Sequence, residues 1–221
     1  MSNNLENISL HKTIVEQVHK VILDAICDGR LEPGERLTQD SVAKKLNVSR
    51  QPVGQALLLL KQQRFVCESG RRGLMVAPLD REFLKSVYEF RMGIDPLAAG
   101  LAAARATPET VRQGMELIEI GEAAVRKGSV PELIAADMGF HIHIYQLAGN
   151  PIILDTMNLY WNHLRRAMRE VLSQTKYRKT IWREHRAILD TIAAHDVSQA
   201  QALARRHLHD ATAGLKIVLP D

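Results

Sequence analysis

The fold of the first third of the chain is decided by the stretch Pro33–Arg72, PGERLTQDSVAKKLNVSRQPVGQALLLLKQQRFVCESGRR. Apolar residues recur at helical spacing on both sides of Asn47, which predicts two short helices joined by a tight turn. Beyond the second helix, two short apolar runs flank a turn rich in glycine and arginine, which is typical of a β-hairpin. This order of elements predicts a winged helix-turn-helix.

Two flanking segments complete the predicted domain. Apolar residues at helical spacing from about Leu10 to Asp28, followed by Gly29, predict a helix before the quoted stretch. After the hairpin, Ala77–Asp80 has the composition of a linker. We therefore expect a winged helix-turn-helix domain over residues 1–78 and a second domain over residues 79–221.

Positive charge is concentrated on the predicted winged helix. Residues 36–72 contain eight Lys and Arg against two Asp and Glu, whereas the whole chain has a formal net charge of +4. A basic concentration on a fold of this kind indicates that the partner is double-stranded DNA. The alternative is a winged helix that contacts another protein.

Such a fold would touch DNA at the N-terminal caps of its two helices, at the exposed start of the second helix and at the hairpin tip. The start of a recognition helix enters the major groove, and arginines on a hairpin tip suit the narrow minor groove. In chain order, the residues at these places are Thr38, Ser49, Arg50, Gln51, Arg71 and Arg72.

The sequence carries no membrane or secretion pattern. No apolar run approaches the roughly 18 residues that cross a bilayer, and the N-terminal MSNNLENISL lacks the pattern of a signal peptide. The two cysteines, Cys27 and Cys67, form no CxxC pair. We expect a cytoplasmic protein with reduced cysteines and no membrane partner.

The second domain has helical periodicity almost throughout. Its predicted helices are separated at Thr107-Pro108, at Gly128-Ser129 and at Gly149–Pro151, and one long helix is expected from there to about Ser173. No pattern of strands competes with the helices. The expected fold is therefore mainly α, with the winged helix-turn-helix followed by an antiparallel all-α bundle of six or seven helices.

One carboxylate and three imidazoles are expected to converge inside this bundle. Asp137 and His141 are four residues apart and share one face of a helix. His185 shares a face with apolar residues, and His207 lies one turn after Leu203, so both should point inward. These four groups predict a divalent-metal site, for zinc first, with nickel, iron or manganese as alternatives. The competing interpretation is that the histidines are hydrogen-bonded core residues.

The first domain resembles the DNA-binding domain of the GntR family of bacterial regulators over about residues 10–78. The resemblance is carried by Pro33–Leu37, by Val48–Arg50 with Pro52-Val53, and by Gly70–Gly73. It implies that Arg36, Arg50 and the hairpin contact phosphates and bases.

This chain departs from the family pattern at three positions of the winged helix-turn-helix. Gln51 stands where the family usually has a threonine, Gly54 stands where it usually has an arginine, and Arg64 stands where a glycine is expected after the helix. We therefore expect an unusual operator, a left-handed backbone at Arg64, and a compensating role for Gln51, since glutamine can pair with adenine.

Residues 80–218 resemble the FCD ligand-binding domain of the FadR subfamily. The motifs that carry this resemblance are Glu89–Arg91 with Asp95, Asp137–His141, Gly149-Asn150, Glu184-His185 and Arg206–Leu208. Members with this pattern hold a metal ion that in turn coordinates a small carboxylate effector. The resemblance implies that Arg91 pairs with the effector carboxylate, and Asn162 and Arg165 are weaker candidates for the same pocket. The alternative for Arg91 is a salt bridge with Glu89 or Asp95.

Together these features predict a homodimeric repressor that binds a DNA operator and responds to a small carboxylate. A regulator whose metal is purely structural is the first alternative. A metal-dependent hydrolase is the second, but the sequence offers no separate general base for it. We therefore expect that the protein is not an enzyme.

Overall fold

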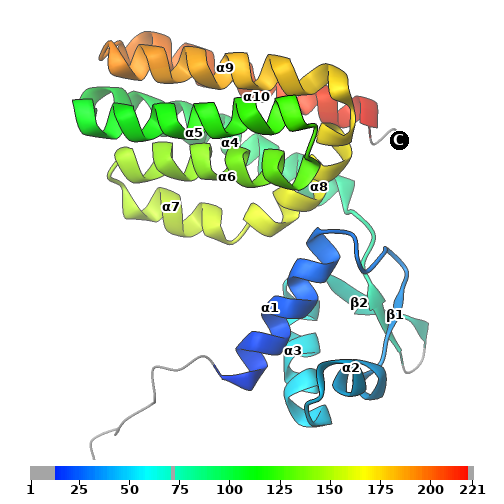
Figure 1. Cartoon of the computed structure of the whole chain (residues 1–221). Coiled ribbons are helices and arrows are strands. Elements are labelled where there is room, and N and C mark those ends of the chain that lie inside the picture. Colours follow the sequence, from blue (N-terminus) through cyan, green and yellow to red (C-terminus); the bar gives the residue numbers. More distant parts are fainter. Residues whose placement is uncertain (1–12, 71–72, 219–221) are drawn as a thin grey trace, which may run out of the picture. The chain divides into compact units, whose positions relative to one another are not determined.

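The computed structural model describes residues 13–70 and 73–218, apart from the side chains of residues 176 and 215–218. Most of its elements are labelled in Figure 1. The chain forms two compact units, Met1–Pro78 and Leu79–Asp221, which are considered one at a time below.

The first unit is a winged helix-turn-helix. Its helices are α1 (Ile14–Cys27), α2 (Gln39–Leu46) and α3 (Arg50–Gln62), and its strands are β1 (Arg36–Leu37), β2 (Val66–Glu68) and β3 (Leu74–Val76). The sheet is antiparallel with strand order β1-β3-β2, and Arg36 pairs with Met75. The two strands of the hairpin were predicted, whereas the two-residue β1 was not.

Local sequence sets the ends of these helices. The Thr38 hydroxyl accepts a hydrogen bond from the backbone N–H of Ser41 at 3.1 Å, which makes Thr38 the predicted cap of α2. Asn47 ends α2 with a φ of 53°, a left-handed conformation that asparagine tolerates. Arg64, after α3, has a φ of 64°, so the left-handed backbone expected at this position is confirmed.

Helix α3 is held by the core of the first unit. Its buried residues pack with α1, α2 and the sheet around a single cluster. Val53, Ala56 and Leu60 are each fully buried in this cluster. The start of α3 is exposed, so the fold presents Arg50 and Gln51 to solvent while the helix body is anchored.

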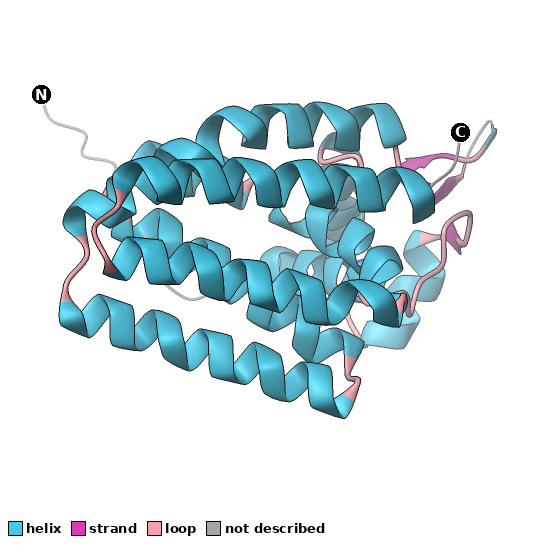
Figure 2. Ribbon diagram, turned by 90° about the horizontal axis from the view of Figure 1, so that it is seen from above, coloured by secondary structure: helices cyan, strands magenta, loops and turns pink. Residues whose placement is uncertain are grey.

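The second unit consists of seven helices in the part of it that the structure describes. They are α4 (Arg81–Arg105), α5 (Pro108–Lys127), α6 (Val130–Leu147), α7 (Pro151–Asn158), α8 (Trp161–Ser173), α9 (Thr175–Ala193) and α10 (Val197–Val218). Figures 1 and 2 show the long helices lying side by side as a bundle. The predicted all-α bundle is confirmed.

The predicted breaks have the expected local causes. Thr107 caps α5, with Pro108 in its first turn; Gly128 ends α5 with a φ of 72°, and Ser129 caps α6. Each of these residues satisfies a backbone group at a helix end or adopts a conformation that ends the helix.

One predicted element was wrong. The single helix expected from Pro151 to about Ser173 is two helices, α7 and α8, separated at Leu159-Tyr160. Neither glycine nor proline marks this break. Tyr160 packs its ring against Phe83 and Phe90 of α4, with centroid distances of 6.1 and 6.2 Å, so packing against another helix accompanies the change of direction.

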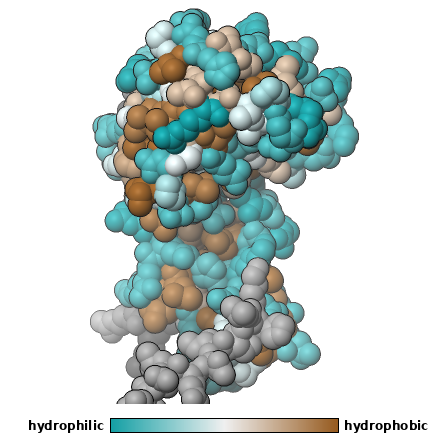
Figure 3. All heavy atoms as spheres, turned by 90° about the vertical axis from the view of Figure 1, so that its left-hand side faces the viewer, coloured by the Kyte–Doolittle hydropathy of each residue, from teal (hydrophilic) through white to brown (hydrophobic). Residues whose placement is uncertain are grey.

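Apolar side chains fill the bundle and also reach its surface. The buried cluster draws on all seven helices. Ile152 and Leu159 are 69% and 70% exposed, and Figure 3 shows apolar residues scattered among polar ones on one face. Among the described helices, none combines the length and apolar character needed to cross a membrane.

Candidate metal centre and DNA interface

Three imidazoles from three helices meet inside the bundle. His141 comes from α6, His185 from α9 and His207 from α10, and each has a ring nitrogen within 4.8 Å of one on the others. All three side chains are buried, with His185 fully so. The structure therefore brings together the three histidines that the sequence singled out.

Asp137 completes the cluster from the turn of α6 before His141. Its two carboxylate oxygens lie 3.8 Å from Nε2 of His141 and 3.6 Å from Nε2 of His185. The Nε2 atoms of His185 and His207 are 3.3 Å apart. Three Nε2 atoms and one carboxylate thus surround a common point, and this is a donor set that zinc and its neighbours accept.

Further groups orient the imidazoles. The Glu184 carboxylate lies 2.8 Å from Nδ1 of His207, so Nε2 is the nitrogen that faces the cluster. Asp95 is more loosely placed, 3.9 Å from Nδ1 of His141. The His185 ring stacks on Phe140 at a centroid distance of 4.3 Å. Its Nδ1 has no hydrogen-bond partner among the described residues.

Burial prepares these groups to donate lone pairs. Removal from water, with a smaller contribution from the nearby Arg91 charge, lowers the pKa of His141 well below its usual value of 6.5. Burial and then His207 lower the pKa of His185 in the same direction. Burial raises the pKa of the Asp137 carboxyl to about 6. Neutral imidazoles bind metal ions, and a cation among these groups would favour the ionised carboxylate.

Arg91 of α4 is buried beside the histidines. Its Nε and Nη2 donate to Oδ2 of Asp95 at 3.1 and 2.7 Å, and the Tyr145 hydroxyl donates to Oδ1 of Asp95 at 2.6 Å. Burial alone would lower the pKa of Arg91, but the Asp95 carboxylate together with Tyr145 and Tyr88 outweighs burial, and the pKa is raised. The guanidinium also lies 5.6 Å from the Trp161 ring. The ion pair between Arg91 and Asp95 that the sequence offered as an alternative is therefore present.

A cavity of about 380 Å³ opens onto this cluster. Asp137, His141, His207 and Arg91 all line it, whereas His185 is not among the described residues of the lining. An ion pair with Asp95 therefore does not remove Arg91 from the cavity. Asn162 and Arg165 of α8 are not among the described residues that line it, and their contact with an effector stays a prediction.

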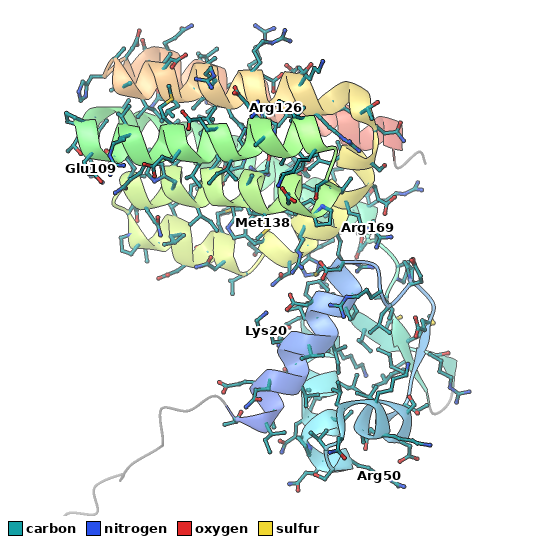
Figure 4. The ribbon with its side chains drawn as sticks, in the orientation of Figure 1. Lys20, Arg50, Glu109, Arg126, Met138 and Arg169 are labelled. Atoms are coloured by element: carbon teal, nitrogen blue, oxygen red, sulfur yellow. The ribbon has the colours of Figure 1, made fainter. Side chains whose placement is uncertain are left out.

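The predicted DNA contacts lie on the winged helix as follows. Arg50, at the start of α3, forms an exposed ion pair with Asp40 of α2, with Nε 2.5 Å from Oδ1. Figure 4 shows Arg50 at the end of α3, with its side chain at the edge of its unit. Gln51 and Arg36 are exposed, on α3 and β1. Ser49 occupies the N-cap position of α3 but makes no capping hydrogen bond through its side chain. Arg71 and Arg72 lie outside the described residues.

Two contributors to the candidate metal centre were not predicted from the sequence. Glu184 directly precedes His185 but orients His207, a contact between α9 and α10 that adjacency in the sequence does not predict. Tyr145 lies one turn after His141 on the same face of α6, and this spacing could have identified it. It supports Asp95 and hence Arg91.

Comparison with known families agrees with the two units. Residues 14–76 match the sequence model for bacterial regulatory proteins of the gntR family, and residues 86–210 match the FCD domain.

Two curated regulators and two solved structures are similar to the chain. The HTH-type transcriptional regulator McbR of Escherichia coli (strain K12) is 26% identical over 68% of each chain. The HTH-type transcriptional regulator YdhC of Bacillus subtilis (strain 168) is 25% identical over 93% of this chain and 92% of its own. The structure of E. coli McbR/YncC superposes with a TM-score of 0.79 at 20% identity, over 94% of this chain and 99% of that one. The crystal structure of a GntR regulator from Rhodococcus sp. RHA1 superposes with a TM-score of 0.78 at 24% identity, over 93% of this chain and 98% of that one. At these identities the structural matches establish a shared fold.

Proposed function

We propose, from the premise that this chain belongs to the GntR family of bacterial regulatory proteins and carries an FCD domain, that a small carboxylate controls its affinity for DNA through a divalent metal ion in the bundle. The family places it among DNA-binding transcriptional regulators and not among enzymes. The observation that carries the proposal is the convergence of Asp137, His141, His185 and His207 at the wall of a cavity that Arg91 also lines.

The four converging residues would hold the metal, and zinc is the ion that we propose. When bound, it supplies a coordination position that a carboxylate oxygen can occupy. Arg91 holds its positive charge at the cavity wall, fixed by Asp95, and attracts a carboxylate from the other side. Glu184 keeps His207 in the orientation that points Nε2 at the cluster.

Regulation follows from the place of the cavity between helices. Its described lining comes from α4, α6, α8, α9 and α10, so an occupant touches five of the seven helices at once. An effector that binds one arrangement of these helices more tightly than another shifts the population toward that arrangement. We propose that the shift lowers operator affinity, so that the protein acts as a repressor relieved by its effector.

DNA would be read by a homodimer in the cytoplasm. An operator with paired half-sites needs two winged helix-turn-helix domains, and two copies of the chain supply them. The proposed contacts in each domain are Arg36, Thr38, Ser49, Arg50, Gln51, Arg71 and Arg72.

The metal content of variants tests the site directly. The full chain purified with zinc should hold one ion per chain, measured by inductively coupled plasma mass spectrometry, and His185→Ala should lose it. His143→Ala is the matched control. Like His185, His143 is buried, but it lies in α6 and its Nε2 is 2.9 Å from the Thr110 carbonyl oxygen, away from the cluster. Wild-type metal content in His185→Ala would show that the metal assignment is wrong.

Control by a carboxylate needs a second measurement. Binding of the zinc-loaded chain to a duplex selected from a random pool should weaken when an effector carboxylate is added. The buried position of the histidines also suits a purely structural metal. In that case chelation would unfold the bundle, yet no carboxylate would alter DNA affinity.

A further inference from the structure

The cavity beside the metal centre has two chemically different ends. The end described above presents Arg91, Asp137, His141 and His207. Away from these groups the described lining is mostly apolar and comes from α8, α9 and α10. The residues of this second end are Met168, Val171, Leu172, Tyr177, Ile181, Ala211 and Gly214.

Positions along α9 and α10 give the separation of the two ends. Glu184 of α9 contacts His207 of α10 at the polar end. At the other end, a Cβ on Gly214 of α10 would lie 3.8 Å from the Tyr177 ring of α9 and 4.0 Å from Val171 of α8. Each helix advances by seven residues between these contacts, which is about 10 Å at the rise of an α-helix. The apolar end is therefore deep enough for the body of a ligand whose head lies at the histidines.

The charges along the wall discriminate between acids. Among the described side chains of the lining, Arg91 is the only lysine or arginine, and Asp95 already pairs with it. Three carboxylates share the same wall, on Asp137, Glu184 and Asp210. A second or third carboxylate on a ligand would meet these groups, whereas an apolar body would lie along the apolar lining and pass only Asp210, which stands between His207 and Gly214 on α10.

We propose that the effector is a monocarboxylic acid with an apolar body up to about 10 Å long, and not a hydroxylated di- or tricarboxylate. The inference rests on the proposed function, because that function places the carboxylate at the metal centre. The volume of about 380 Å³ lies within the range of small-molecule pockets.

Calorimetric titration of the zinc-loaded full chain tests the class of ligand. The probes are acetate, butyrate, hexanoate and octanoate on one side, and malate and citrate on the other. Affinity should rise about fourfold for each methylene added to the alkanoate, because each added methylene is buried against the apolar lining of the cavity. Malate and citrate should bind more weakly than hexanoate.

A variant at the far end locates the apolar body. Gly214 is buried within α10, so Gly214→Leu fills this end without a change of backbone conformation. Octanoate should then lose at least tenfold in affinity, while acetate should bind as before. Ala213→Leu is the matched control, since it places the same leucine side chain on the exposed side of the same turn.

The possible outcomes distinguish failure of this inference from failure of the proposed control by a carboxylate. If citrate or malate binds more tightly than hexanoate, the apolar body is wrong while a carboxylate effector stands. If the alkanoates bind but Gly214→Leu behaves like Ala213→Leu, the body does not enter this end and the inference fails. If none of the six acids binds the zinc-loaded chain, both the inference and the carboxylate effector are overturned.

Discussion

In each histidine of the cluster, the two ring nitrogens have different surroundings. His207 presents Nε2 inward while Glu184 fixes Nδ1, and His141 faces Asp137 with Nε2 and Asp95 with Nδ1. His185 has Phe140 stacked on its ring instead of a polar partner for Nδ1 among the described residues. Burying such polar groups is costly unless they are paired. The unpaired atom of His185 is Nδ1, whereas a metal ion would bind the Nε2 atoms of His185 and His207, which face each other at 3.3 Å.

Asp95 shows how one buried carboxylate can serve several neighbours. It accepts two hydrogen bonds from Arg91 and one from Tyr145, and it faces His141 at 3.9 Å. Because the Arg91 charge is buried, removal of Asp95 would leave it uncompensated, which typically costs about 3–5 kcal/mol. Asp95 is thus the residue that compensates the Arg91 charge and orients its guanidinium at the cavity wall.

In the winged helix-turn-helix, Gly54 of α3 is the position where a single substitution should change DNA binding. A Cβ there would meet the Gln39 side chain at 3.1 Å, and that side chain is exposed and can move aside. Gly54→Arg should add one phosphate contact and steepen the salt dependence of DNA binding by about one unit in a log–log plot. Fluorescence anisotropy at several salt concentrations measures this slope.

The control for Gly54 is Gly54→Gln, which adds a long neutral side chain at the same place. It should leave the salt slope unchanged while gaining the same helix propensity, which is about 1 kcal/mol for replacing an interior glycine. An unchanged slope in Gly54→Arg would show that position 54 does not face a phosphate.

At the scale of helices, glycines set how closely two of them approach. Gly121 of α5 lies against the buried Trp182 of α9, and a Cβ at this position would come within 2.1 Å of the indole ring. Helices α5 and α9 pack along their lengths. Their spacing therefore depends on the absence of a side chain at residue 121, and α9 carries His185 of the candidate metal centre.

Gly121→Ala should consequently destabilise the bundle. Overpacking of a rigid core costs about 1–3 kcal/mol, which exceeds the helix-propensity gain of up to about 1 kcal/mol. Urea unfolding followed by tryptophan fluorescence measures the change. The matched control is Gly93→Ala in α4, where an added Cβ meets nothing within 4 Å and a small gain in stability is expected. Equal stabilities of the two variants would contradict the tight contact.

At the scale of the whole molecule, the proposed function assigns DNA reading to one unit and effector sensing to the other. The candidate metal ligands and both tryptophans, Trp161 and Trp182, belong to the unit Leu79–Asp221. Tryptophan fluorescence therefore reports on this unit alone. A metal ion that binds only the folded state adds stability that depends on its concentration relative to Kd.

Removal of zinc should thus lower the thermal transition seen by tryptophan fluorescence. Zinc at about 100 to 1,000 times its Kd contributes roughly 3–4 kcal/mol, which corresponds to a shift on the order of 10 °C for a protein of this size. A chelator titration during thermal unfolding measures it. The transition of His185→Ala should not respond to the chelator. A wild-type transition that is equally insensitive would contradict a metal in this bundle.

Patterns between residues close in the chain predicted much of this molecule. The caps at Thr38, Thr107 and Ser129 and the left-handed backbone at Arg64 are decided by local backbone chemistry, so the sequence places them. The pairing of Asp137 with His141 on one face follows from helical spacing alone. For the same reason the mainly α fold and the winged helix could be predicted.

Tertiary packing decided what no local pattern encodes. The sequence could place His185 and His207 on inward faces, but their approach to 3.3 Å depends on how α9 and α10 are set beside each other. Packing between helices also accounts for three other features. They are the break at Leu159-Tyr160, the contact of Glu184 with His207, and the approach of Tyr177 and Val171 to Gly214 at the cavity. Helix faces follow from a period of 3.6 residues, whereas which face meets which is fixed by the close packing of all seven described helices together.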